Sequence, residues 1–165
     1  MIKLDSFVNK SKKNIVEMFL DKEVRKTYML PDFKSKQEAE DLFDRIQRMS
    51  LSNDRFVKCI YFDDGINESI AIGIINETEK DNKMIELGYA INPRFQGRGY
   101  CTLALNKAIN MLLDQGYEKV TCGAFSTNLA SIRVMEKVGM TKVSKTETIN
   151  YRGKDHLCVF YEYNV

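Results

Sequence analysis

The sequence predicts an α+β domain: a mixed, mostly antiparallel sheet of six to seven strands, flanked by about four helices. Three observations indicate this class. The middle of the chain holds three successive segments rich in β-branched and aromatic residues, helical and strand-like segments then alternate, and the tail has the pattern of a hairpin. No repeat, low-complexity segment or Pro/Gly/Ser linker interrupts the chain, so we expect one domain over residues 1–165.

The first half predicts a short strand followed by helices. Ile2 and Leu4 alternate with polar residues as in a strand, and helical sequence follows from about residue 10 to residue 30, where Pro31 ends it. A second helix begins at Ser35, which forms a capping-box signature with Glu38 and precedes apolar residues at helical spacing.

The middle predicts three antiparallel strands. Residues 54–62 and 69–77 are joined by the hairpin-like stretch "DDGIN", and residues 84–91 follow the polar turn "EKDNK". In the third of these strands, the apolar residues alternate onto one face and leave Glu86, Gly88 and Ala90 on the other.

The second half predicts a helix, a strand, a helix and a hairpin. The first helix covers about residues 97–115, and residues 117–125 form the strand. Asn128 is the expected N-cap of the second helix, Gly139 follows its end, and the last hairpin turns at Arg152–Gly153. One face of the first helix is expected to consist of Leu103, Ala104, Ala108, Met111 and Leu112.

Composition and charge exclude several classes of function. A net charge of +2, from 25 basic and 23 acidic residues, does not favour nucleic acid as a partner. We expect a cytoplasmic protein that does not bind membranes, because the sequence shows no signal peptide and no long apolar run. The four widely spaced cysteines predict reduced thiols, and a single histidine, His156, makes a metal site unexpected.

The stretch "NPRFQGRGYCTLAL", residues 92–105, is the strongest candidate for a binding site. Two glycines precede a helix, which fits either a plain strand-to-helix turn or an anion site made of backbone N–H groups and the helix dipole. It is neither a P-loop nor a dinucleotide fingerprint, because both need further glycines or a lysine at fixed spacing.

Three motifs in this order resemble the GNAT N-acetyltransferase superfamily. The stretch Gln96–Cys101 resembles its motif Q/R-x-x-G-x-G/A, "IELGYAINP" its fourth strand, and "NLASIRVMEKVGM" the motif that follows. The resemblance implies a GNAT-like fold and acetyl-CoA as cosubstrate, with no metal, and the motifs are most similar to the RimL-like branch, which acetylates protein N-termini and other amines. The residues it implies for binding acetyl-CoA are Tyr89, Ala90, Ile91, Gln96, Gly97, Arg98, Gly99, Tyr100, Cys101, Thr102, Asn128 and Ser131.

The resemblance supports the catalytic residues less fully. Met135 stands where many members have a tyrosine that protonates the thiolate, and Gly123 stands where some have a glutamate base. The remaining candidates are Glu86 as the base, acting directly or through water, and Ser131 as the proton donor. Each also has a structural alternative: Glu86 as a solvated or paired carboxylate, and Ser131 as a first-turn serine.

The amine acceptor stays open at this point. The resemblance places it near the early helices and the last hairpin, where Tyr28 and Met29, together with Glu86, are the expected contacts. We expect direct attack by a primary amine of low pKa, such as a protein or peptide N-terminus. The alternatives are a polyamine or aminoglycoside acceptor and a non-catalytic acyl-CoA-binding module, and a homodimer is possible.

Overall fold

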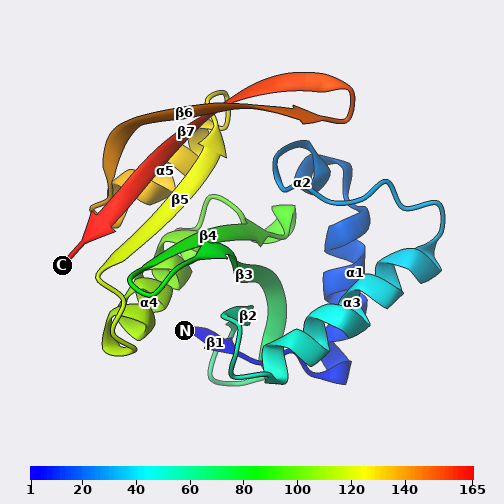
Figure 1. Cartoon of the computed structure of the whole chain (residues 1–165). Helices are drawn as coiled ribbons and strands as arrows, with labels where there is room; N and C mark the ends of the chain where they lie inside the picture. Colours follow the sequence, from blue (N-terminus) through cyan, green and yellow to red (C-terminus); the bar gives the residue numbers. More distant parts are fainter. The chain divides into compact units, whose positions relative to one another are not determined.

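The computed structural model describes all 165 residues and contains one seven-stranded sheet (Figure 1). Its strand order is β1-β2-β3-β4-β5-β7-β6, and β4 and β5 pair in parallel, whereas the pairs β1–β2, β2–β3, β5–β7 and β6–β7 are antiparallel. The predicted fold class is confirmed. The strands are β1 Ile2–Asp5, β2 Val57–Phe62, β3 Ile70–Lys80, β4 Met84–Ile91, β5 Lys119–Phe125, β6 Thr141–Tyr151 and β7 Lys154–Asn164.

The helical sequence expected over residues 10–30 forms two helices. They are divided at Asp21, because its carboxylate accepts the backbone N–H groups of Glu23 and Val24 and starts a new helix there. The helices are α1 Lys12–Leu20, α2 Lys22–Thr27, α3 Lys36–Leu51, α4 Tyr100–Asp114 and α5 Leu129–Lys137, with short 3-10 turns η1 Asn9–Ser11 and η2 Pro93–Phe95.

The capping box expected at the start of α3 forms only in part. The Glu38 N–H donates to Ser35 Oγ at 3.3 Å, as predicted, but the Glu38 carboxylate accepts the N–H of Lys34 at 2.7 Å instead of that of Ser35. Both bonds satisfy donors at the helix entry, so α3 still begins where the sequence places it.

The chain forms two compact units, which we describe one at a time. The first comprises Met1–Asn76 and Tyr89–Ala104, and the second comprises Glu77–Gly88 and Leu105–Val165. β3, β4 and α4 each contribute residues to both units. The single domain expected over residues 1–165 stays a prediction. None of the helices is long and apolar enough to span a bilayer.

The core of the first unit lies under α1 and α3, which run side by side (Figure 1). Phe19, Phe43 and Ile74 are fully buried there, and the ring of Phe7 packs edge-to-face on that of Phe43 at a centroid distance of 5.9 Å. Burying each such side chain stabilises the fold by roughly 1.5–3 kcal/mol. The amphipathic spacing that predicted α3 therefore also accounts for its position in the core.

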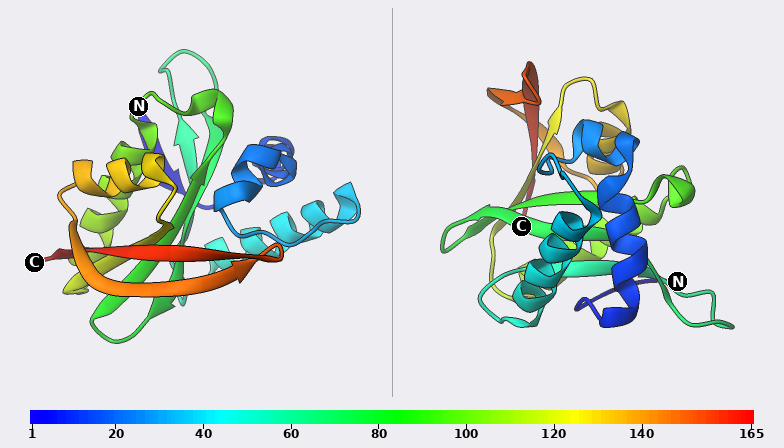
Figure 2. Two further views of the ribbon diagram at one scale, coloured as in Figure 1. Left: turned by 90° about the horizontal axis from the view of Figure 1, so that it is seen from above. Right: turned by 90° about the vertical axis from the view of Figure 1, so that its right-hand side faces the viewer.

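The second unit is built on β5 and the long β6–β7 hairpin, which Figure 2 shows as a twisted ribbon. The hairpin turns at Arg152 and Gly153, with φ of 55° and 72°, as the sequence predicts for a two-residue turn that needs positive φ at both positions. Asn128 caps α5 through its side chain, and Gly139, with φ 88°, follows the end of this helix.

The buried face of α4 differs from the prediction at one edge. Leu105 and Ile109 are fully buried, whereas Leu103 is 51% exposed. Ala104, Ala108 and Leu112 are buried as expected. Periodicity alone did not identify the correct edge of the stripe, because Leu103 and Leu105 flank the same alanine and are equally apolar.

Candidate functional site

In the first unit, the loop between β4 and α4 presents an open backbone surface. Gly97 and Gly99 have φ of 72° and 77°, a conformation that side chains with a Cβ rarely adopt. A Cβ built on either glycine would meet no atom within 4 Å. No protein atom therefore fills the space in front of the loop, and a side chain at either glycine position would project into this space.

The start of α4 supplies donors to this space. The first turn of any helix has N–H groups without intrahelical acceptors, here those of Tyr100, Cys101 and Thr102, and the helix dipole adds a partial positive charge. The first i to i+4 bond that leaves the loop runs from Leu103 N–H to the carbonyl of Gly99, at 3.1 Å. A loop of this kind can hold phosphate oxygens, which is the property expected of a pyrophosphate site.

Side chains behind the loop hold it in place. Gln96 donates from Nε2 to the carbonyl of Ile91 at 3.0 Å, which ties the loop to the end of β4. The ring of Tyr100 lies 5.0 Å from that of Phe62, and Phe95 lies 6.4 Å from the same ring. Arg98 stacks over Phe95 at 5.9 Å and so stays beside the glycines. The sequence did not indicate this aromatic support, because Phe62 is distant along the chain.

The end of β4 lies close against β3. An added Cβ on Gly73 would come within 2.4 Å of the carbonyl oxygen of Ala90, so only glycine allows this approach of the two strands. Beyond Ala90, the N–H of Asn92 donates to the carbonyl of Ile72 at 2.8 Å. The predicted positions Tyr89, Ala90 and Ile91 are thus part of a rigid strand end that leads into the glycine loop.

The two early residues predicted to contact the acceptor have different surroundings. The hydroxyl of Tyr28 donates to Asn76 Oδ1 at 2.7 Å, and burial raises the pKa of this phenol. Met29 is 53% exposed. Tyr28 is therefore anchored to β3 as a fixed hydroxyl, while Met29 is the accessible one of the pair.

In the second unit, Glu86 lies on β4 with its carboxylate accepting the Thr78 hydroxyl at 2.7 Å. Its cross-strand neighbour on β5 is Thr121, which in turn faces Glu162 on β7. No lysine or arginine pairs with Glu86, which leaves the second carboxylate oxygen available to a proton. This arrangement suits a base, although the hydrogen bond from Thr78 was not foreseen.

Asn128 and Ser131 are joined at the start of α5. The Ser131 N–H donates to Asn128 Oδ1 at 3.2 Å, so the side chain of Asn128 serves as the cap. One turn further on, Met135 is fully buried and packs in the core. Met135 has no hydroxyl that could protonate a thiolate. This is the difference from the family motif that the sequence indicated.

Gly123 has a packing reason for lacking a side chain. A Cβ there would lie 2.8 Å from Cε1 of Phe160, its cross-strand partner on β7. The ring of Phe160 therefore covers the place that a longer residue at position 123 would need. A side chain at the position where the resemblance implies a base in some family members would have to displace this ring.

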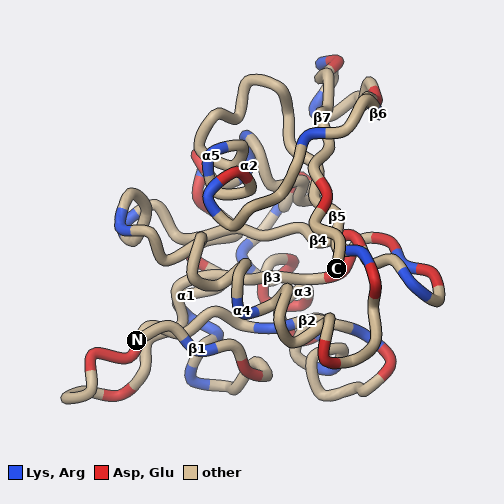
Figure 3. Tube along the Cα trace, turned by 90° about the vertical axis from the view of Figure 1, so that its left-hand side faces the viewer, with Lys and Arg blue, Asp and Glu red and all other residues tan.

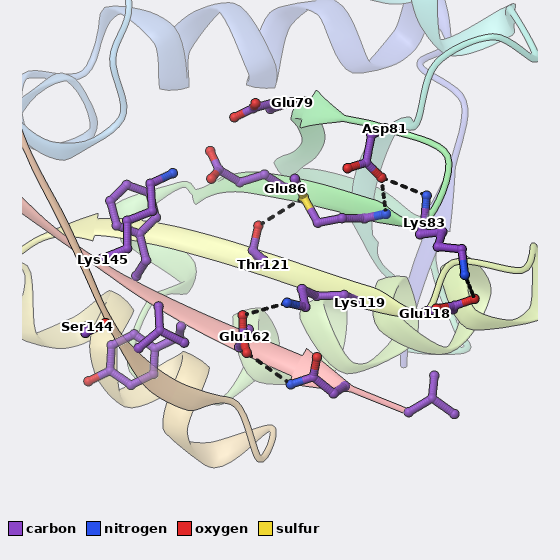
Figure 4. A pocket seen from close by; sticks show the side chains of 16 residues that line it. Glu79, Asp81, Lys83, Glu86, Glu118, Lys119, Thr121, Ser144, Lys145 and Glu162 are labelled. Atoms are coloured by element: carbon purple, nitrogen blue, oxygen red, sulfur yellow. Dashed lines mark hydrogen bonds and ion pairs between the residues drawn. The ribbon is translucent and has the colours of Figure 1, made fainter.

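A groove of about 1030 Å³ lies over the same face of β4, β5 and β7 (Figure 4). Glu86, Thr121, Phe160 and Lys145 are among the residues that line it. The β6–β7 register slips there, so that Val143, Ser144 and Lys145 stand opposite the single residue Phe160. Such bulges re-aim side chains, and this one directs β6 residues into the groove. No pattern in the sequence predicts the bulge.

The four cysteines are free thiols, as predicted, and three of them are buried. Burial raises the pKa of Cys101 to about 12, which makes this thiol a poor nucleophile despite its place in the glycine loop. No group of three or more His, Cys, Asp or Glu side chains is arranged to hold a metal ion.

The comparison with protein families identifies the domain. The model of the acetyltransferase (GNAT) domain matches residues 3–141. An uncharacterized N-acetyltransferase of Bacillus subtilis, YjdG, is 37% identical over 60 residues; this match spans 36% of the chain and only 36% of that relative's length.

Solved structures share the fold at low sequence identity. The microcin C7 self-immunity acetyltransferase MccE, in complex with acetyl-CoA and AMP, has a TM-score of 0.83 and 17% identity, with 99% of this chain and 92% of that chain covered. RimL, a ribosomal L7/L12 α-N-protein acetyltransferase in complex with coenzyme A, has a TM-score of 0.79 and 16% identity, with 99% of this chain and 94% of that chain covered. Spermidine N-acetyltransferase from Vibrio cholerae, in complex with CoA and spermine, has a TM-score of 0.76 and 15% identity, with 99% of this chain and 95% of that chain covered.

These neighbours act on different acceptors according to their names, so they do not single out the RimL-like branch. The family model covers most of the chain, and the seven-stranded sheet and the loop after β4 agree with it. The chain belongs to the GNAT acetyltransferase family.

Proposed function

We propose that this protein is an acetyl-CoA-dependent N-acetyltransferase that transfers an acetyl group to a primary amine by direct attack. The observation that carries the proposal is the pair of open, left-handed glycines at the entry of α4. Solved relatives of the same fold bind acetyl-CoA or CoA. When bound, the cosubstrate supplies an activated acetyl group as a thioester.

Each step assigns a role to groups of this chain. The N–H groups of Gly97 to Thr102 hold the anionic part of the cosubstrate, with Arg98 adding charge. A backbone N–H near Ile91 polarises the thioester carbonyl and stabilises the developing oxyanion. Glu86 accepts the proton that the attacking amine loses, directly or through water. Ser131 is the remaining candidate for returning a proton to the thiolate.

The acceptor class follows from the free energy of deprotonating the amine. At pH 7, a lysine amine with a pKa near 10.4 costs roughly 4.6 kcal/mol to deprotonate, whereas an α-amine with a pKa near 7.8 costs about 1.1 kcal/mol. Because Met135 and Gly123 replace the tyrosine and glutamate that would assist, we infer that the acceptor is a low-pKa amine such as a protein or peptide N-terminus. An acceptor of this kind would be similar to that of RimL-like enzymes, and this part of the proposal rests on the chemistry of the amine.

Two measurements test the proposal. Calorimetric titration with acetyl-CoA is expected to give saturable micromolar binding, and release of the CoA thiol is expected with peptides that have a free N-terminus. Binding without thiol release on any amine would instead identify a non-catalytic acyl-CoA-binding module. A plot of log(kcat/KM) that still climbs with unit slope at pH 10 would refute the low-pKa acceptor.

A further inference from the structure

The groove beside Glu86 is larger and more charged than acetyl transfer to a small amine requires. Its volume of about 1030 Å³ lies at the upper end of the range for drug-sized ligands, roughly 300–1,000 Å³. It is an open channel lined by strands, and it lies wholly within the second unit. Space of this size accommodates a stretch of peptide that follows the reacting group.

The charges of the groove do not balance. Five carboxylates and three lysines line it. Lys83 pairs with Glu118 at 2.7 Å and Lys119 pairs with Glu162 at 3.3 Å, while Lys145 pairs with Glu147, which is not part of the lining. The groove therefore has an excess of negative charge in a chain of net charge +2, whose basic and acidic residues are otherwise interspersed (Figure 3).

The carboxylates of the groove that form no ion pair are Glu79, Asp81 and Glu86. Asp81 is occupied by the turn between β3 and β4, where it accepts the N–H groups of Lys83 and Met84. Glu86 accepts one hydroxyl, and Glu79 makes no hydrogen bond or ion pair. Figure 4 shows Glu79 and Glu86 on the same side of the groove. These two side chains can therefore receive cations without breaking an existing ion pair.

The groove is better suited to separated cations than to a metal ion, because no group of three or more His, Cys, Asp or Glu side chains is arranged to hold one. The Phe160 ring in the groove already holds a cation, since the Lys145 ammonium lies 4.3 Å from its centroid. Glu79 on β3 and Glu86 on β4 come from neighbouring strands, which usually lie about 4.8 Å apart.

We propose that the groove binds the residues that follow the acceptor N-terminus and selects peptides with basic side chains at about positions 2–4. An extended peptide advances about 3.4 Å per residue and neighbouring strands lie about 4.8 Å apart, so basic side chains within the first few residues after an amine at Glu86 can reach Glu79. The inference rests on the proposed function, because the amine must reach Glu86 for the rest of the peptide to lie in the groove.

The test uses three peptides with the same first residue and with arginine, alanine or glutamate at positions 2–4. Arginine replaces lysine so that the α-amine is the only primary amine. With saturating acetyl-CoA, kcat/KM is expected to be about tenfold higher for the arginine peptide than for the alanine peptide, and lowest for the glutamate peptide. The advantage should shrink as the ionic strength rises.

Matched variants locate the effect. Glu79→Lys is expected to reduce kcat/KM for the arginine peptide by about tenfold, so that its advantage over the alanine peptide is lost. Glu68→Lys is the control: Glu68 is an exposed carboxylate on the turn before β3, outside the groove, so the same change of net charge there should have little effect.

Binding is measured separately, by fluorescence anisotropy of the same peptides labelled at the C-terminus. Equal kcat/KM for all three peptides, or equal effects of the two variants, would overturn the groove assignment while leaving the acetyltransferase intact. Selective binding of the arginine peptide without thiol release would refute the enzyme and support the groove. Spermidine used as well as or better than the arginine peptide would overturn the peptide assignment and favour a small polyamine.

Discussion

The glycine loop allows a direct test of the cosubstrate site, because the chain contains a control with the same backbone strain. Gly99 in the loop has φ 77°, and Gly65 in the turn between β2 and β3 has φ 80°. An added Cβ meets nothing within 4 Å at either position. The variants Gly99→Ala and Gly65→Ala therefore have the same conformational penalty and differ in what lies in front of the loop.

The stability cost should be equal for the two variants. A residue with a Cβ in the left-handed region costs about 1–2 kcal/mol, and for a chain of this size each 1 kcal/mol lowers Tm by about 2–4 °C. Thermal denaturation of both proteins should therefore show the same loss of a few degrees relative to the unmodified chain.

The binding cost should appear only in Gly99→Ala. Its methyl group occupies the space from which an anion reaches the loop N–H groups, and loss of one hydrogen bond to a charged oxygen costs about 1.5–3 kcal/mol. We expect the calorimetric Kd for acetyl-CoA to rise at least about tenfold, with Gly65→Ala unchanged. If both variants bind acetyl-CoA as the unmodified protein does, the loop is only a strand-to-helix turn.

Three further changes test the second unit. Glu86→Gln should lower kcat/KM about 100-fold with the Kd of acetyl-CoA unchanged; a fall of less than about threefold in the thiol-release assay would remove Glu86 as the base. Gly123→Ala should cost about 1 kcal/mol in urea denaturation, because its Cβ meets the Phe160 ring at 2.8 Å, and Phe160→Leu in the same chain should recover part of this loss. Hydrogen bonds from the N–H groups of Lys83 and Met84 hold the pKa of Asp81 below its usual value, so its contribution to stability is present above the unfolded-state pKa and is lost as pH falls through the lower folded-state pKa. Asp81→Asn should therefore destabilise the protein at pH 7 and progressively less as the pH falls through the folded-state pKa; a difference that does not shrink would show that the charge is irrelevant.

Local sequence signals predicted most of the fold. Apolar alternation located the three central strands, Asn128 and Gly139 bounded α5, and Arg152–Gly153 located the last turn, because each of these is decided by neighbours in the chain. The break between α1 and α2 was missed because the run from residue 10 to residue 30 contains no proline or glycine before Pro31. Asp21 ends one helix and caps the next without either signal.

The site was predictable in its backbone and less so in its side chains. Gly97 and Gly99 could be recognised because their conformation is a local requirement. The hydrogen bond between Thr78 and Glu86 and the ring of Phe160 over Gly123 depend on strand pairing, and the register slip beside Lys145 changes which residues of β6 enter the groove. Such contacts between distant segments leave no periodic trace in one sequence.

The charge of the groove and the pKa of the acceptor amine are linked. Unpaired carboxylates such as Glu79 and Glu86 favour the protonated form of any amine bound near them and so oppose its deprotonation. Basic side chains on the acceptor would neutralise these carboxylates and lower the pKa of the bound amine again. The pH dependence of kcat, which reports the bound complex, should therefore have a lower midpoint for the arginine peptide than for the alanine peptide. In Glu79→Lys the two midpoints should converge. Identical midpoints in the unmodified protein would mean that the groove carboxylates lie too far from the amine to influence its pKa, and that any selection of basic peptides acts on binding alone.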